Sequence, residues 1–150
     1  MDVARPCAMK TIVFAMLLVT VLTSPSIAQQ NPVEGYQRLA AKSTLYAAPP
    51  EYEKWWSEVV KDCGCEPQVR LSDIWWMQVN AATFDCIEHD GCHGSYWPDM
   101  TSAFIGHDDI HHAMIVKHEM LHAILGGDPQ HAHKAWGSDV LMRLARDGRW

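Results

Sequence analysis

The chain has 150 residues, and its 12 Lys and Arg residues against 18 Asp and Glu residues give a formal net charge of −6 at pH 7. The basic residues are scattered and form no stripe, which excludes the charge pattern of a nucleic-acid-binding protein. A chain of this length has room for one domain with one modest hydrophobic core.

Residues 1–28 have the pattern of a secretory signal peptide. A start with two basic residues is followed by an apolar stretch, residues 11–22, and by a small-residue cleavage site, Ser26-Ile27-Ala28. The apolar stretch is too short to span a membrane comfortably. We therefore expect the signal peptide to be removed, which leaves a secreted or periplasmic domain of residues 29–150 without membrane attachment.

The first part of this domain contains one clear helix. Residues 29–48 show no strong periodicity, and we predict a mobile N-terminal arm or a short pro-segment there. Pro49-Pro50 then introduces a helix from about Glu51 to Asp62, which Gly64 ends. The apolar face of this helix consists of Trp55, Trp56, Val59 and Val60.

Four cysteines remain after removal of the signal peptide, and export makes disulfides plausible. Cys63 and Cys65 are poorly placed to bond each other, so we expect each to pair with Cys86 or Cys92. The sequence does not separate these two cross-linked arrangements. The alternative is a second metal site formed by the same cysteines, a reading that an oxidising compartment disfavours.

Two further regions predict strands. Residues 74–79 have the length and aromatic content of a strand, and Tyr96-Trp97 followed by residues 102–105 indicates another. Ser138 is placed to cap a last helix, residues 139–146. We therefore expect an α+β fold, with a short mixed sheet packed on one buried helix.

That buried helix is predicted from Ile110 to Leu125. Asp108 or Asp109 is the expected N-cap, and Gly126-Gly127 ends the helix. Apolar residues cover most of the circumference, which is typical of a buried helix. Its one polar stripe contains His111, His118, Glu119 and His122.

The stripe contains a motif with a specific chemistry, His118-Glu119-Met120-Leu121-His122. Two histidines four residues apart on a helix project from the same face and can both bind one Zn²⁺ ion. The glutamate between them can act as the general base toward a metal-bound water. This motif predicts metal-assisted hydrolysis.

A catalytic zinc site normally has three protein ligands and one water. No glutamate follows Glu119, so the third ligand is sought among the aspartates and histidines after the helix. Because Gly126-Gly127 lets the chain reverse, the next residues can fold back toward the metal. We favour His131 as the third ligand, with Asp128 and His133 as alternatives.

The motif is that of the zincin metallopeptidases, and residues 116–125 followed by 127–131 resemble a group of small exported bacterial proteins. Those proteins have the same helix, a glycine-containing break and a later histidine. In zincins a neighbouring strand commonly lies at the edge of the cleft, which by resemblance implies Ala103 to Gly106 as the substrate-binding edge. The chain departs from the metzincin pattern, because Leu125 and Asp128 stand where that pattern has glycine and histidine.

The predicted function is that of a secreted zinc peptidase, with metal ligands His118, His122 and His131 and with Glu119 as general base. The expected partner is a peptide or protein substrate, and the protein is expected to be a monomer. Two alternatives remain: a zinc hydrolase of a non-protein amide such as cell-wall material, and a non-catalytic metal-binding exported protein. The candidates for stabilising the oxyanion are Tyr96, His107 and His111.

Overall fold

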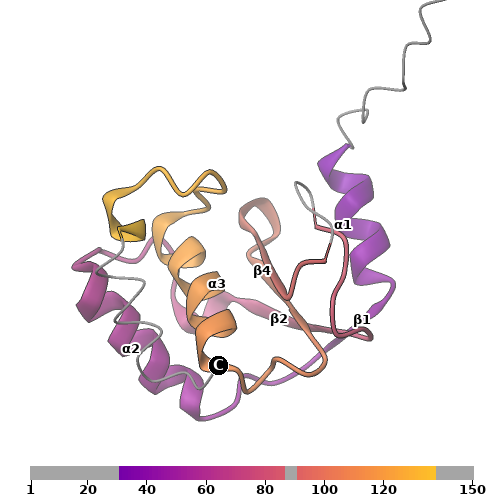
Figure 1. The fold of residues 1–150 in the computed structure, drawn as a ribbon, viewed down its shortest axis with the longest axis horizontal. Coiled ribbons are helices and arrows are strands. Elements are labelled where there is room, and N and C mark those ends of the chain that lie inside the picture. Colours follow the sequence, from indigo (N-terminus) through magenta and orange to yellow (C-terminus); the bar gives the residue numbers. More distant parts are fainter. Residues whose placement is uncertain (1–30, 87–90, 138–150) are drawn as a thin grey trace, which may run out of the picture.

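The computed structural model of the protein describes residues 31–86 and 91–137, which form three α-helices and one four-stranded mixed sheet (Figure 1). The helices are α1 (Pro32–Ala40), α2 (Glu51–Cys63) and α3 (Ala113–Leu125). The strands are β1 (Ser43–Leu45), β2 (Trp75–Val79), β3 (Gly94–Trp97) and β4 (Ser102–Gly106). The predicted signal peptide, residues 1–28, and the predicted last helix, residues 139–146, lie outside the described residues.

The sheet has the order β1-β2-β4-β3. Strands β2 and β4 are parallel, whereas β1 and β3 run antiparallel to their neighbours at the two edges. The α+β class, the mixed sheet and its packing against the helix of the motif agree with the sequence-based expectation. The predicted helix at residues 51–62 and the predicted strand at residues 74–79 are both confirmed, as α2 and β2.

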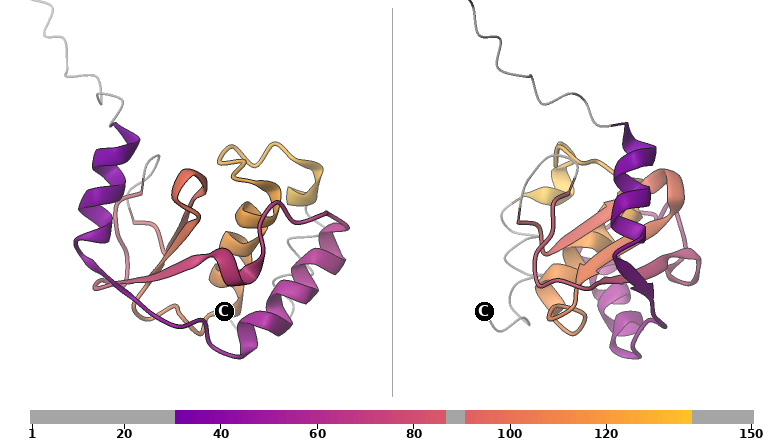
Figure 2. Two further views of the ribbon diagram at one scale, coloured as in Figure 1. Left: turned by 180° about the vertical axis from the view of Figure 1, so that it is seen from behind. Right: turned by 90° about the vertical axis from the view of Figure 1, so that its right-hand side faces the viewer.

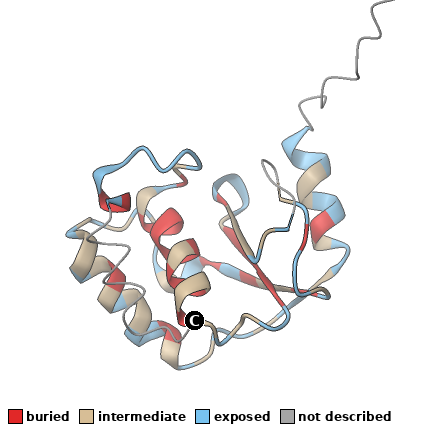
Figure 3. Ribbon diagram, viewed as in Figure 1, coloured by how far each residue is buried: buried red, intermediate tan, exposed pale blue. Residues whose placement is uncertain are grey.

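The helices cover both faces of the sheet, α1 on one face and α2 with α3 on the other (Figure 2). Side chains of β4 alternate between these layers: Ala103 and Ile105 pack with α2 and α3, and Phe104 packs with Leu39 of α1. A strand covered on both faces is mostly apolar, as Ala103 to Ile105 are here, and its buried polar side chain, Ser102, has hydrogen-bond partners. All five residues of β4 are buried accordingly (Figure 3).

Helix α1 and strand β1 form where the sequence shows no strong periodicity, within residues 29–48. The side chain of Asn31 accepts a hydrogen bond from the backbone N–H of Val33, and Pro32 occupies the first turn, where its missing N–H costs nothing. Only Leu39 of α1 is buried. Such a short helix with one buried anchor leaves little apolar periodicity in the sequence.

Helix α3 begins at Ala113, three residues later than predicted, and neither Asp108 nor Asp109 is its N-cap. The chain before it forms turns, in which the backbone N–H of His112 donates to the carbonyl of Asp109. The Asp109 carboxylate instead lies 2.8 Å from the Nδ1 atom of His93. A contact with a distant histidine has therefore replaced the predicted cap.

Strand β4 is an interior strand, so the predicted substrate-binding edge at Ala103 to Gly106 is wrong. Its backbone pairs with β2 on one side and with β3 on the other. The apolar run that marked these residues reflects burial between two layers. The edge strand next to α3 is β3, which pairs only with β4 among the described residues.

The predicted cross-linking of the cysteines is also wrong, because both disulfides are local. Cys63 bonds Cys65, and Cys86 bonds Cys92. Gly64 between the first two cysteines has a φ of 62°, a left-handed conformation that lets the chain turn at the end of α2. Phe84 and Cys92 form an isolated antiparallel bridge that brings the second pair together. The cysteines considered for a second metal site are thus used in disulfides.

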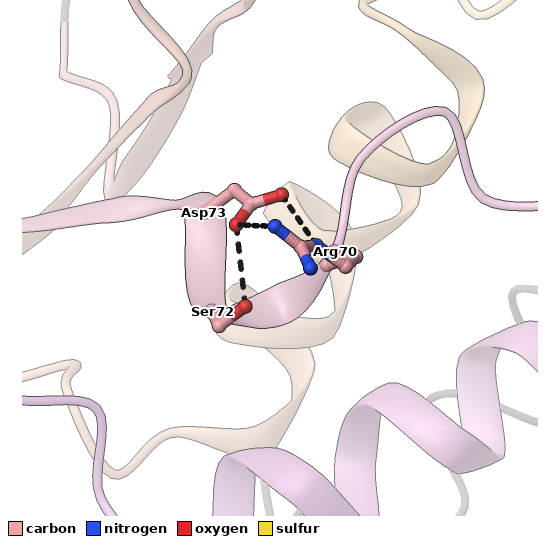
Figure 4. Close-up of polar contacts among 3 residues, drawn as sticks. All are labelled: Arg70, Ser72 and Asp73. Atoms are coloured by element: carbon pink, nitrogen blue, oxygen red, sulfur yellow. Dashed lines mark hydrogen bonds and ion pairs between the residues drawn. The ribbon is translucent and has the colours of Figure 1, made fainter.

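The segment between α2 and β2 is fixed at both ends. The backbone N–H of Gln68 donates to the carbonyl of Ile124, near the C-terminal end of α3. Just before β2, the guanidinium group of Arg70 donates to both carboxylate oxygens of Asp73 at 2.9 and 3.0 Å, and the Ser72 hydroxyl also donates to Asp73 (Figure 4). The Gln68 hydrogen bond joins this segment to the C-terminal end of α3, and the bonds among Arg70, Ser72 and Asp73 stabilise a local turn before β2.

None of the helices in the described part of the chain is long and apolar enough to cross a membrane. The two disulfides suggest an oxidising extracellular compartment.

Candidate metal site

Three histidines converge at the C-terminal half of α3. His118 and His122 lie one turn apart on the helix, and His131 returns to them from the following loop. One nitrogen of each side chain lies within 4.8 Å of the others, and the Nε2 atoms of His122 and His131 are 3.1 Å apart. The three therefore form a group that could hold a metal ion.

The ring of His122 is fixed by the glycine break after α3. The backbone N–H of Gly127 donates to the His122 carbonyl at 2.8 Å, and the His122 Nδ1–H donates to the Gly127 carbonyl at 2.6 Å. With its proton on Nδ1, the ring presents the lone pair of Nε2 to His131. An outer hydrogen bond of this kind is what orients histidines that bind metals.

The donor set fits zinc. Two imidazole nitrogens at about 2.1 Å from a tetrahedral zinc would be about 3.4 Å apart, close to the 3.1 Å between His122 and His131. Burial, with the neighbouring histidines, lowers the pKa of His118 to about 3, and burial lowers that of His122 to about 4. Both rings are therefore neutral at pH 7, as metal coordination requires.

The loop after α3 brings His131 to the site, whereas Asp128 and His133 are not part of the three-histidine group. Asp128 and His131 both adopt left-handed backbone conformations, with φ of 46° and 53°. For residues other than glycine this costs about 1 kcal/mol or more each. His133 has a local role, since its Nδ1 atom accepts a hydrogen bond from the backbone N–H of Ala135.

Trp136 is a site residue that the sequence analysis missed. It is buried, and its ring centroid lies 5.0, 4.6 and 4.2 Å from those of His118, His122 and His131. An indole that contacts all three rings covers the group from one side. A tryptophan three residues after His133 was the only signal in the sequence.

Glu119 is buried beneath strand β3. The backbone N–H of Tyr96 donates to its carboxylate, and a Cβ atom built on Gly94 would lie 2.5 Å from its Oε1 atom. Burial raises the pKa of Glu119 to about 8, against the hydrogen bond from Tyr96, which lowers it. The Oε2 atom has no hydrogen-bond partner among the described residues. A buried carboxylate with an unused oxygen fits a site that receives a cation or a proton.

The structure separates the three candidates for stabilising the oxyanion. His107 contacts Asp108 at 3.0 Å, and His111 contacts Glu51 of α2 at 2.6 Å, so both exposed rings have partners away from the three-histidine group. Tyr96 adjoins Glu119 through its backbone, and its side chain packs partly buried against the core of α2 and α3. Among the described residues, Tyr96 is the one candidate of the three with a contact to the motif, through Glu119.

Comparison with protein-family models, with curated proteins and with solved structures finds no match to the chain.

Proposed function

We propose that this protein is a zinc-dependent peptidase of an extracellular or periplasmic compartment, with His118, His122 and His131 as the metal ligands. The observation that carries the proposal is the placement of Glu119, a buried carboxylate that lies on the same helix as two of three converging histidines. A site that only stores metal has no need of a buried glutamate beside it. A hydrolase needs such a proton acceptor.

The chemistry divides between the metal and the chain. Zinc held by three imidazoles supplies Lewis acidity toward a carbonyl oxygen and toward water. A cation held by the three histidines would favour the ionised form of Glu119 over the protonated form that burial favours. The Glu119 carboxylate would then take a proton from the attacking water and deliver it to the nitrogen of the leaving amine. Strand β3 holds the carboxylate in place for both transfers through the Tyr96 N–H.

The substrate is proposed to lie along β3, since this strand is unpaired on one side in the described part of the chain and contacts Glu119. An extended peptide can add to a sheet edge through main-chain hydrogen bonds. This assignment replaces the interior strand β4 as the candidate edge. We further propose that the protein acts as a monomer.

The test combines zinc analysis with cleavage. The purified domain is expected to bind one zinc ion and to cleave casein or a mixed peptide library, and Glu119→Gln should abolish cleavage while retaining zinc. His131→Ala should weaken zinc binding. Zinc binding without cleavage would transfer the proposal to a non-protein amide, such as cell-wall material, or to a metal-binding protein without catalysis. Absence of zinc binding by the wild-type domain would overturn the metal site itself.

A further inference from the structure

We propose that Asp128 and Trp136 are positioning residues that together hold His131 in place as the third ligand, before any metal binds. The inference rests on the proposed metal site and names how the chain completes it. It also gives Asp128 a role different from that of a ligand.

Asp128 organises the loop through both carboxylate oxygens. Its Oδ1 atom accepts a hydrogen bond from the backbone N–H of Ala132 at 3.1 Å. Its Oδ2 atom accepts hydrogen bonds from the backbone N–H of His133 and from the Nε1–H of Trp136, both at 2.8 Å. The two backbone donors directly follow His131 in the chain, so the carboxylate holds the chain on the C-terminal side of this histidine.

The loop needs such a hold because its backbone is in an unfavourable conformation. Asp128 and His131 are the ends of a short turn, in which the N–H of His131 donates to the carbonyl of Asp128. Both have left-handed φ angles, which side chains other than glycine rarely adopt. His131 itself is exposed, so burial does not hold its side chain in place.

Trp136 connects this loop to the other two ligands. Its indole is buried and contacts the rings of all three histidines, with His131 the nearest at a centroid distance of 4.2 Å. Its N–H bonds Asp128 at the same time. The indole therefore couples the position of the loop to the histidines of α3.

The same contacts argue against Asp128 as a ligand. Each of its oxygens already accepts at least one hydrogen bond, and coordination would compete with three donors. Loss of Asp128 should therefore act only through His131, which makes the inference testable by a pair of variants.

The experiment measures the zinc dissociation constant by competition with a chelator for the mature domain and four variants. These are Asp128→Ala, Trp136→Phe, His131→Ala and the double variant Asp128→Ala/His131→Ala. Asp128→Ala is expected to weaken zinc binding about 10- to 100-fold, as outer-shell substitutions do. In the His131→Ala background the same substitution should cause no further loss. Trp136→Phe keeps an aromatic ring but removes the N–H, and should cause a smaller loss.

Asp73→Ala is the matched control, because Asp73 is an exposed aspartate whose side-chain hydrogen bonds are with Arg70 and Ser72 and not with the loop that carries His131. It should leave zinc affinity unchanged. If circular dichroism shows that Asp128→Ala does not fold, Asp128→Asn, which keeps the size of the side chain, replaces it in the experiment.

An equal loss from Asp128→Ala with and without His131 would overturn the inference, since Asp128 would then act independently of this ligand. Unchanged affinity in Asp128→Ala would overturn it as well. Zinc binding with the expected pattern but without cleavage would reject the proposed peptidase and leave this inference standing. Absence of zinc binding in the wild type would reject the metal site and the inference together.

Discussion

His122 is the residue at which helix capping and the proposed metal chemistry meet. The N–H of Gly127 donates to the backbone carbonyl of His122, and the carbonyl of Gly127 accepts a hydrogen bond from the His122 ring. The turn that ends α3 therefore also sets the orientation of a proposed ligand. The spacing of the motif and the glycines that end the helix are visible in the sequence, because both depend on local helix geometry. The buried surroundings of Glu119 are not, because Gly94 and Tyr96 lie far away along the chain.

Titration of the buried site residues should shape the stability of the metal-free protein. Glu119 has a pKa of about 8 when folded against 4.5 ordinarily, so the folded state binds more protons and loses stability as pH rises from 4.5 to 8. His118 and His122 have lowered pKa values, so their contribution is complete above pH 6.5 and is lost as pH falls below it. Between pH 4.5 and 6.5, the stability gained from the two histidines as pH rises exceeds the stability lost from Glu119. The free energy of unfolding is therefore expected to be largest near pH 6.5.

Glu119→Gln should remove the decrease between pH 6.5 and 8, because glutamine has no proton to lose. Thermal unfolding in the presence of a chelator, for wild type and variant at both pH values, checks this. The wild type is expected to melt at a lower temperature at pH 8 than at pH 6.5, and the variant is not. A decrease of equal size in both proteins would show that other groups cause it.

Among the elements, strand β3 controls the position of Glu119. Gly94→Ala would place a methyl group 2.5 Å from Oε1 and 2.9 Å from Cδ of Glu119, so the carboxylate must move. A displacement of about 1 Å can cost about 100-fold in rate. We expect peptide cleavage to fall by about this factor while one zinc ion is still bound.

Ser95→Ala is the matched control for this variant. Ser95 is the next residue in β3, and neighbouring residues in a strand point to opposite faces. Cleavage should therefore remain close to that of the wild type. Loss of zinc in Gly94→Ala would contradict the separation of the base from the three-histidine group.

Helices α2 and α3 are joined by an ion pair. The Nζ atom of Lys117, which is 1% exposed, lies 2.9 Å from Oε2 of Glu58. Glu58→Gln would remove the negative charge while leaving the buried ammonium group, and about 2 kcal/mol of stability should be lost. Urea unfolding measures it, with Glu53→Gln as an exposed control on the same helix. A variant as stable as the control would show that the pair contributes little.

The elements also show what sequence patterns can and cannot predict. The sequence predicts α2 from Pro49-Pro50 before it, Gly64 after it and the apolar periodicity between them. It predicts the body of α3 from its apolar residues and from Gly126-Gly127 at its end. The sequence predicted β4 as the strand at the sheet edge next to the site, whereas that strand is β3. An interior strand and an edge strand differ in the strands that pair with them, and the residues of one segment do not reveal its partners. Strand β3 is only four residues long and contains Gly94, so it carries a weak pattern of its own.

For the whole molecule, the disulfides are local links within regions of the chain. By loop entropy, closing the short loop between Cys86 and Cys92 stabilises the fold by about 2 kcal/mol, against about 3 kcal/mol for each predicted cross-link. The spacing of Cys63 and Cys65 predicted that they would not bond each other, but the left-handed turn at Gly64 brings their Cα atoms to 5.2 Å.

Cleavage with trypsin under non-reducing conditions distinguishes the two pairings. Cutting after Lys61, Arg70 and Lys117 separates peptide 62–70, which contains Cys63 and Cys65, from peptide 71–117, which contains Cys86 and Cys92. Mass spectrometry should find these peptides unlinked, each two mass units lighter than its reduced form. A linked pair of peptides would contradict the local disulfides.

The loop that returns His131 to α3 also bears on the order of events during folding. All three proposed ligands lie within residues 118–131, so bringing them together closes only a short loop and costs little chain entropy. The contact of Glu119 with β3 requires the sheet to be assembled first. An ion can therefore be captured by a nascent C-terminal region before the base is in position, so that this chain would acquire its metal early and its reactivity late.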